Sequence, residues 1–316
     1  MNEIEIINTI RKELGISKAP FLDAEYSPFL GTNIIATTDM LNEGDDFPKG
    51  MPFEAIGWVS IAANLSDLAA VGAKPLFLLT NWGIPSNLKR QDIASIARGM
   101  QKCASFHGVK ILGGDINKTE KLAIAGVAIG YAKKPLQRKG AREGDILALT
   151  GKVGATAAAY LIYKEGKNSI SPAERAFLSR FNKPTIKLAL MQKFASLSLA
   201  SAATDLSDGL SPAIYSICKE SGKGARVEYG RIPFFSGINE FASKRKLTPI
   251  YLANLGNDYE ILLAIKKEKL SLARKTAARL HIPLYEIGKI TKENKVLLSK
   301  NSPLSPFPKE GFSHFP

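Results

Sequence analysis

Four acidic clusters, each beside hydroxyl, small or apolar residues, are the segments of this sequence best suited to chemistry. They are Thr37-Thr38-Asp39, Asn64-Leu65-Ser66-Asp67, Gly113-Gly114-Asp115 and Asp205-Leu206-Ser207-Asp208. A carboxylate in such a setting is costly to bury unless it is paired or bound to a metal ion. Carboxylates gathered from distant parts of a chain can hold Mg²⁺ on a polyphosphate, because this ion prefers oxygen ligands and keeps some of its water. The sequence therefore predicts an acidic cleft that binds metal ions.

The elements that must position these clusters follow from the hydrophobic pattern. Residues 33–39 predict a short buried strand that ends in the first cluster, and a helix from about residue 53 to 70 carries the second. A strand over 109–112 is expected to end in a turn at the third cluster. The fourth cluster is expected to open a helix that runs to about Ser221, with Asp205 or Ser207 as its cap.

The alternation of strands and helices predicts an α/β (α+β) fold, and 316 residues are enough for two domains. The basic linker over residues 133–140 separates an N-terminal domain, residues 1–140, from a C-terminal domain, residues 141–316. In the latter, Gly151-x-x-Gly154 lies where a strand runs into a helix, so its backbone N–H groups could bind phosphate. Neither the Walker spacing nor the dinucleotide fingerprint is complete, which favours a role in tight packing.

The bulk properties place the chain among ordinary globular proteins, with one outlying number. The net charge of +14 is compatible with a nucleic-acid or anionic partner, but the basic runs lack the interleaved aromatic residues of a single-strand platform. A solvated, lysine-rich surface is the favoured interpretation, and nucleic-acid binding is not expected. The two cysteines lie far apart, which fits a reducing compartment. No apolar stretch reaches the roughly 18 residues of a membrane span, so we expect a cytoplasmic protein.

Taken in order, the clusters resemble the thiamine-monophosphate kinase family. The resemblance runs from about residue 33 to the end, and the blocks 64–75 and 205–210 are its most specific parts, followed by Gly256-x-Asp258-Tyr259-Glu260. That family belongs to the aminoimidazole ribonucleotide synthetase-like, or PurM-like, group of ATP-using enzymes. The resemblance implies a two-domain PurM-like fold, a homodimer joined through the first domain, and ATP with several Mg²⁺ ions in the cleft. It also implies phosphorylation of thiamine monophosphate to thiamine diphosphate.

The resemblance further implies roles for residues at the matching positions. The expected metal ligands and their neighbours are Thr37, Thr38, Asp39, Asp67, Asp115, Asp205 and Asp208. Among these, Asp39, Asp115 and Asp205 are the expected catalytic residues. ATP is expected to contact Gly114, Asp115, Arg138 and Ser207.

The departures from the family pattern fall mainly on the substrate side. A Gly-Asp-Asp motif that precedes the first site strand in the family is missing, and Asp23 is the one plausible substitute for its metal ligand. Asp46 stands where the family has a substrate-contacting histidine, and Asn257 stands where it has a glutamate. Phe312 matches an aromatic residue that stacks on the substrate. Such changes of charge and hydrogen bonding can shift specificity when the groups are buried.

Two other functions therefore compete with thiamine-monophosphate phosphorylation. One is a related PurM-like ATP-dependent enzyme that phosphorylates or activates a different small-molecule substrate. The other is a non-catalytic nucleotide-binding homologue that has lost its acceptor site. The retained aspartates argue against the second, since clustered carboxylates without a use would be costly.

Overall fold

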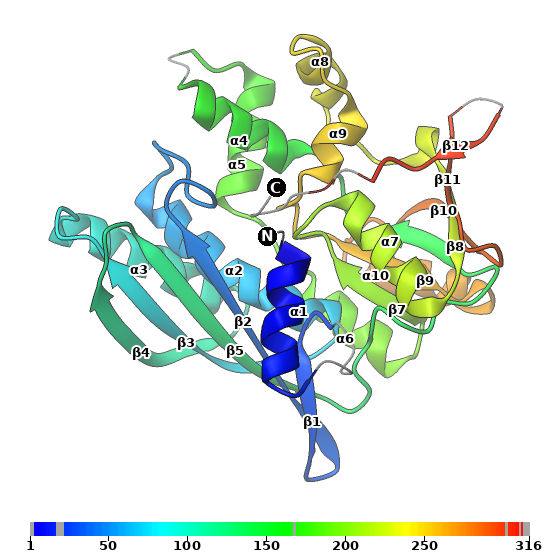
Figure 1. Ribbon diagram of the computed structural model, residues 1–316, viewed down its shortest axis with the longest axis horizontal. Helices are drawn as coiled ribbons and strands as arrows, with labels where there is room; N and C mark the ends of the chain where they lie inside the picture. Colours follow the sequence, from blue (N-terminus) through cyan, green and yellow to red (C-terminus); the bar gives the residue numbers. More distant parts are fainter. Residues whose placement is uncertain (1–2, 17–21, 167–168, 301–302, 310, 312–316) are drawn as a thin grey trace.

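A computed structural model describes residues 3–16, 22–166, 169–300, 303–309 and 311. It contains a five-stranded sheet in the N-terminal half and a seven-stranded sheet in the C-terminal half, with helices between and around them (Figure 1). This arrangement confirms the predicted α/β class. The first helix, α1 (Glu3–Glu13), lies between the two halves, in front of the other elements in this view. The domain boundary near residue 140 stays a prediction.

The first sheet has the strand order β1-β2-β5-β3-β4. Its strands are β1 (Glu25–Phe29), β2 (Thr32–Asn42), β3 (Lys74–Ile84), β4 (Lys110–Lys118) and β5 (Ala123–Ala132). Helix α2 (Phe53–Ala70) covers one face and packs against α3 (Arg90–Phe106). The two helices approach closely because Gly57 and Gly99 lack side chains: a Cβ atom at either position would lie 1.9 Å from a backbone oxygen of the other helix.

Helix α2 is the central element of the molecule. Nearly every one of its side chains is buried, as expected for a helix that is apolar on all sides. Besides the first sheet, it contacts two helices and a strand of the second half. Because it reaches both halves, its polar residues Asn64, Ser66 and Asp67 lie where the two halves meet.

The second sheet has the strand order β12-β11-β8-β10-β6-β9-β7. Its strands are β6 (Ile146–Leu149), β7 (Ala200–Asp205), β8 (Gly224–Glu228), β9 (Ile261–Ile265), β10 (Tyr285–Thr291), β11 (Val296–Ser299) and β12 (Ser305–Pro306). The α-helices of this half are α4 (Ala155–Glu165), α5 (Pro172–Asn182), α6 (Leu188–Ser196), α7 (Leu210–Ser221), α8 (Ile238–Ser243), α9 (Pro249–Asn254) and α10 (Leu270–Arg279). Two short 3₁₀ turns are η1 (Tyr229–Arg231) and η2 (Lys267–Lys269). In the described part of the chain, no helix is long and apolar enough to cross a membrane.

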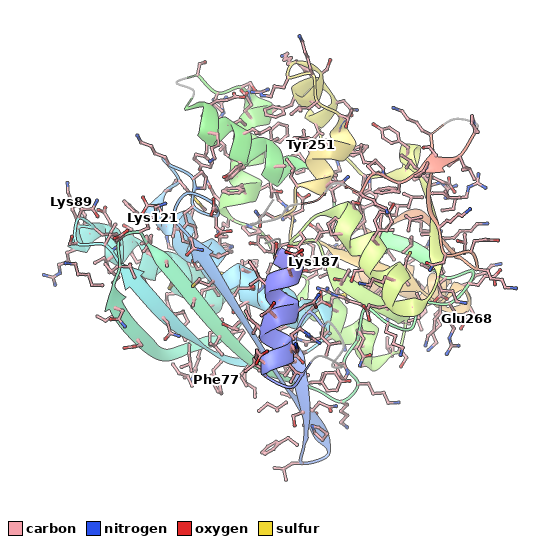
Figure 2. The ribbon with its side chains drawn as sticks, viewed as in Figure 1. Phe77, Lys89, Lys121, Lys187, Tyr251 and Glu268 are labelled. Atoms are coloured by element: carbon pink, nitrogen blue, oxygen red, sulfur yellow. The ribbon has the colours of Figure 1, made fainter. Side chains whose placement is uncertain are left out.

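The outer face of the first sheet exposes large apolar side chains. Ile34 and Met40 of β2 are 37% and 61% exposed, and Leu79 of β3 is 36% exposed on the same face. The charged side chains elsewhere are distributed around the periphery, where Lys89, Lys121 and Glu268 project away from the molecule (Figure 2). This distribution fits the solvated basic surface that was favoured from the sequence.

Three local predictions were wrong. The third acidic cluster is not a turn, because β4 continues through Asp115 in parallel pairing with β3, past an irregularity at Leu78/Leu79. Helix α7 is not capped by Asp205 or Ser207: its N-cap is Gly209, which makes no side-chain capping bond. The strand over 33–39 is longer than predicted, and one of its faces is exposed.

Candidate active site

A cavity of about 690 Å³ lies between the two halves and collects residues from both. Its polar lining comprises Asp23, Glu25, Thr37, Thr38, Asp39, Asp46, Asp67, Arg138, Asp205, Ser207, Asp208, Asn257 and Tyr259. The acidic cluster that sequence analysis predicted is therefore assembled from β2, α2, β7 and the segments beside them. Two predicted residues are absent from this lining, Gly114 and Asp115. Phe312 lies outside the described residues.

Helix α2 connects the carboxylates of the two halves. Thr37 Oγ1 of β2 donates to Asp67 Oδ2 at 2.5 Å, and Ser66 Oγ donates to Asp205 Oδ2 at 2.6 Å. Because Ser66 and Asp67 are consecutive, the same turn of α2 carries the Asp67 carboxylate, which is bonded to the first half, and binds the Asp205 carboxylate of the second half. Sequence analysis did not assign a role to Ser66, although its place beside Asp67 in the second cluster was the available signal.

The backbone of β2 at Asp39 is fixed by the same helix. Asn64 Oδ1 accepts a hydrogen bond from the Asp39 N–H at 3.2 Å. Asn64 is buried, and it fits only because Gly126 of β5 has no side chain: a Cβ atom there would lie 2.2 Å from Asn64 Nδ2. Thr38 Oγ1 donates to the carbonyl of Gly126 at 2.8 Å. Asn64 is thus a second positioning residue that sequence analysis did not identify.

The turn after β7 presents the fourth cluster. Ser207 Oγ donates to Asp205 Oδ1 at 2.9 Å, so this carboxylate is hydrogen bonded on both oxygens. The turn packs against the segment before β9, where the Asn257 N–H donates to the Ser207 carbonyl at 2.7 Å. At this contact Gly256 is required, since a Cβ atom would lie 2.1 Å from the Ser207 oxygen. The carboxylates therefore point into the cavity and leave the helix end uncapped.

Burial and mutual repulsion raise the pKa values of the gathered carboxylates. Burial, followed by the charges of Asp208 and Asp46, raises the pKa of Asp39 to about 6. Burial and the neighbouring Asp39 and Asp205 raise the pKa of Asp67 well above its ordinary value. Burial, followed by the charge of Asp23, raises the pKa of Asp205 to about 7. The cavity thus concentrates negative charge that a cation would relieve.

One basic side chain, Arg138, enters this acidic lining. Its Nη2 lies 2.9 Å from Asp23 Oδ1 and its Nε lies 3.2 Å from the same oxygen, while Thr204 Oγ1 donates to that oxygen at 2.7 Å. Asp23 thus lies in the cavity, as expected for a substitute of the missing motif, and here it is held by Arg138. The guanidinium lies at the junction of the main cavity with a second one of about 440 Å³ beneath α1.

Asp46 and Asn257 line the part of the cavity that borders a third, small hollow. The Asp46 carboxylate accepts a hydrogen bond from the Asn42 N–H at 2.8 Å, which closes the turn after β2. Asn257 and Tyr259 have φ values of +61° and +49°. This left-handed conformation costs roughly 1–2 kcal/mol for a residue with a side chain, so the surrounding contacts must maintain it. A small hollow of about 10 Å³ behind them is lined by Asp46, Val59 and Phe181 as well.

Asp115 lies apart from these residues, on the exposed edge strand β4. It lines a shallower cavity of about 230 Å³ with Asn81, Trp82 and Ile116. That cavity shares Met40 with the main one, so the two adjoin across β2. The prediction that Asp115 and Gly114 join the acidic cluster within one chain fails geometrically, because β4 is separated from β2 by β3 and β5.

Comparison with known proteins decides the family. Residues 25–132 match the N-terminal domain of the AIR synthase related proteins, and residues 142–299 match their C-terminal domain. A thiamine-monophosphate kinase from Methanospirillum hungatei is 31% identical over 294 residues, which cover 89% of this chain and 88% of that protein. The chain belongs to the thiamine-monophosphate kinase family.

Other members of the family extend the similarity over the whole chain. A thiamine-monophosphate kinase from Nitrosopumilus maritimus is 29% identical over 317 residues, covering 100% of this chain and 99% of that protein. A solved structure described as AaThiL complexed with AMPPCP and TMP superposes with a TM-score of 0.87 at 27% identity, covering 99% of this chain and 97% of that one. The PurM-like fold expected from the resemblance is thereby confirmed.

Proposed function

We propose that the protein transfers a phosphoryl group from ATP to thiamine monophosphate, which yields thiamine diphosphate. The observation that carries this proposal is the acidic cavity in a member of the thiamine-monophosphate kinase family, with Asp39, Asp67 and Asp205 converging in it. Phosphoryl transfer depends mostly on positioning and charge neutralisation. The acceptor phosphate is a monoester whose second pKa is about 6, so it is largely ionised at neutral pH and needs no strong base.

The donor set of the cavity fits Mg²⁺ bound together with polyphosphate. Among the described residues, no three His, Cys, Asp or Glu side chains are already arranged around one metal position. The carboxylates instead converge in pairs with hydroxyls, Asp67 with Thr37 and Asp205 with Ser207. Mg²⁺ usually takes one or two carboxylates and completes its shell with phosphate oxygens and water, so a preformed cage is not required. When bound, Mg²⁺ would neutralise the phosphate charges.

The residues divide between a metal-binding side and an acceptor side. In this assignment Thr37, Asp39, Asp67, Asp205 and Asp208 hold the metal ions, with Thr38 beside them. Arg138 and Ser207 contact the nucleotide, because they lie at the junction of the two larger cavities. Beside the small hollow, Asp46 and Asn257 contact the acceptor, for which Phe312 remains a proposed stacking partner.

We further propose a homodimer formed through the outer face of the first sheet. The exposed Ile34, Met40 and Leu79 form an apolar surface there, and such surfaces on single subunits often mark interfaces. Asp115 lies on this side of the molecule, in a cavity that adjoins the acidic one at Met40. A nucleotide that extends from the acidic cavity past Met40 would reach Asp115, and a second copy would cover it.

Leu79→Lys is expected to convert the dimer into a monomer, because it places a charge on the apolar outer face of the sheet. Sedimentation velocity measures the change in mass. Leu272→Lys, which alters an apolar side chain that is 46% exposed on α10, is the matched control and should leave the mass unchanged. A wild-type protein that sediments as a monomer at all concentrations would remove the proposed dimer.

The proposed reaction is tested by incubating the protein with ATP, Mg²⁺ and thiamine monophosphate. Wild-type protein should form thiamine diphosphate, and Asp39→Asn should lower kcat by on the order of 10³-fold, because the lost charge is one the transition state needs. Asp45→Asn, which changes an exposed aspartate in the adjacent loop, should retain wild-type turnover. If the protein binds ATP but forms no thiamine diphosphate, it acts on a different acceptor. Asp46 and Asn257, which replace the histidine and glutamate of the family, would then explain the change of acceptor.

A further inference from the structure

The acceptor-side segment alternates between residues that face the cavity and residues that are buried behind it. Asn257 and Tyr259 line the cavity, whereas Asp258 and Glu260 are 0% and 2% exposed. Nothing in the proposed reaction uses the two buried carboxylates. Both lining residues have the left-handed backbone conformation, which side chains disfavour. The contacts of Asp258 and Glu260 therefore need an explanation of their own.

Asp258 is held by the N-terminal end of α4. Its Oδ2 accepts a hydrogen bond from the Gly154 N–H at 2.7 Å, and its Oδ1 accepts one from Thr156 Oγ1 at 2.8 Å. Thr156 Oγ1 is also 2.9 Å from the Gly256 carbonyl. These bonds fix the backbone on the N-terminal side of Asn257 to the helix. The Gly154 N–H, a candidate phosphate donor in the sequence, is occupied by this carboxylate.

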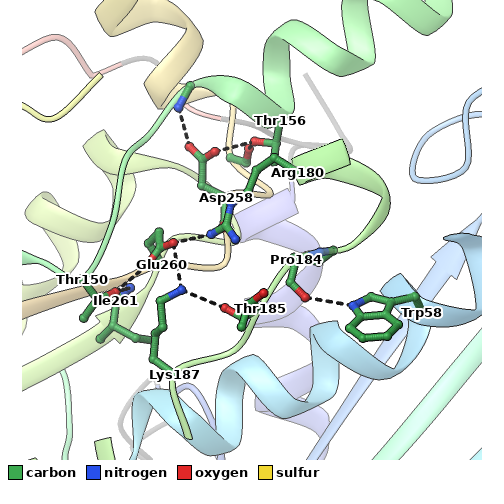
Figure 3. Close-up of polar contacts among 12 residues, drawn as sticks. Trp58, Thr150, Thr156, Arg180, Pro184, Thr185, Lys187, Asp258, Glu260 and Ile261 are labelled. Carbon is green, nitrogen blue, oxygen red and sulfur yellow. Dashed lines mark hydrogen bonds and ion pairs between the residues drawn. The ribbon is translucent and has the colours of Figure 1, made fainter. Parts of the chain in front are cut away.

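Glu260 lies at the centre of a buried ionic network (Figure 3). Its carboxylate accepts a hydrogen bond from Thr150 Oγ1 at 2.7 Å, pairs with Arg180, and lies 3.2 Å from Lys187 Nζ. Gly151 makes room for it, since a Cβ atom at that position would lie 2.3 Å from the carboxylate carbon. Gly151 thus serves packing, as favoured from the sequence, whereas Gly154 donates its N–H to Asp258, so the two glycines contact the two carboxylates that flank Tyr259.

The network is also connected to both sides of the cavity. The Glu260 carbonyl accepts a hydrogen bond from the Leu206 N–H at 2.9 Å, next to Asp205. On the other side, the segment that carries Lys187 contacts the first half, because Trp58 Nε1 of α2 donates to the Pro184 carbonyl at 2.8 Å. A shift of Glu260 would therefore be transmitted to the acceptor residues first, since they adjoin it in the chain.

We propose that Asp258 and Glu260 are positioning residues that hold Asn257 and Tyr259 in their left-handed conformation and so set the geometry of the acceptor end of the cavity. This inference rests on the proposed function for its kinetic test. The two carboxylates act through the backbone: each is bonded on the side away from the cavity, and between them they fix both ends of the Asn257–Tyr259 segment. The acceptor-binding groups are thus oriented before the acceptor arrives.

The test compares Asp258→Asn and Glu260→Gln with wild type in steady-state kinetics. Each variant should raise KM for thiamine monophosphate at least about tenfold, because small displacements of positioning groups have effects of this size or larger. The dissociation constant for AMPPCP with Mg²⁺ should change less than about twofold, whereas a general loss of structure would weaken both ligands. Glu286→Gln, at the exposed ion pair with Arg274, is the matched control and should leave both constants unchanged.

A substitute variant and a crystal structure complete the test. If Glu260→Gln does not fold, Thr150→Val removes one hydrogen bond to the same carboxylate at similar side-chain volume, and the same rise in acceptor KM is expected. A crystal structure of whichever variant folds should show that φ at Asn257 or Tyr259 has left the positive region. Unchanged acceptor KM, or an unchanged backbone at both residues, would overturn the inference. Wild-type protein that forms no thiamine diphosphate would refute the proposed function instead, and the crystal structure would still decide the positioning role.

Discussion

Replacing Asp67 by asparagine is expected to abolish turnover and, at the same time, to raise the thermal stability of the metal-free protein. Asp67 lies deep in the cavity beside Asp39 and Asp205, and burial together with these neighbours raises its pKa well above the ordinary value. Its charged form is thus unfavourable in the folded protein without a cation. Asparagine has the same shape, removes the charge, and can still accept the hydrogen bond from Thr37. The metal-binding charge, however, is lost.

The two effects are measured on the same samples. With EDTA present, the melting temperature of Asp67→Asn should exceed that of wild type, whereas kcat with Mg²⁺ should fall by on the order of 10³-fold or more. Adding Mg²⁺ and AMPPCP should stabilise wild type strongly and the variant weakly, because a ligand stabilises only the state that binds it. Asp45→Asn should leave all three quantities unchanged. A lower melting temperature of Asp67→Asn in EDTA would mean that Asp67 is primarily a structural hydrogen-bond partner.

The acidic cavity could be predicted from the sequence because its parts are local. Asp39, Asp67 and Asp205 each lie in a short motif with recognisable neighbours, and those motifs retained their order along the chain. The length of α2 could also be predicted, since apolar residues recur on all sides of the segment Phe53–Ala70 and Gly72 follows as a natural stop. Local sequence patterns therefore identify the site carboxylates and the helices or strands that contain them.

The positions that depend on pairing between distant segments could not be predicted. Asp115 was expected in the cluster, but the extension of β4 along β3 places it on the outer edge of the sheet. Strand β7, which carries Asp205, was missed because Ala200–Asp205 is short and consists largely of alanine, so its pattern favours neither strand nor helix. In the sequence, Asp258 and Glu260 are recognised only as part of a family motif. Their contacts with Gly154 and Arg180, which the structure shows, explain why both residues are carboxylates.

The free energy of unfolding of the metal-free protein is expected to fall as the pH rises from about 4 to about 7. Asp205 has a pKa of about 7 in the folded protein, compared with 3.8 as the ordinary value. Between these values the folded state binds more protons than the unfolded state, so each titrating group removes about 1.4 kcal/mol of stability per pH unit. Below pH 4 the group is protonated in both states, and its contribution is fully present. Above pH 7 it is ionised in both states, and the contribution is lost.

Other groups titrate in the same range, so the contribution of Asp205 is best measured as a difference. Asp39 and Asp258, with pKa values of about 6, act in the same direction. His107 acts in the opposite direction, because burial lowers its pKa to about 4. Denaturant unfolding at several pH values in EDTA should give a less steep decline for Asp205→Asn than for wild type, and the two curves should become parallel above pH 7.

Mg²⁺ distinguishes the cavity carboxylates from Asp258, which lies behind it with its own hydrogen-bond donors. When Mg²⁺ and AMPPCP are both present at saturating concentration, the free energy of unfolding of wild type should decline less steeply with pH, because cations favour the ionised form of Asp39 and Asp205. The smaller part of this pH-dependent decline that Asp258 causes should remain. Asp258→Asn should remove that part whether or not Mg²⁺ is present. If Mg²⁺ leaves the wild-type pH dependence unchanged, the raised pKa values would reflect burial of carboxylates that bind no metal ion, and the metal-binding half of the proposed function would fail.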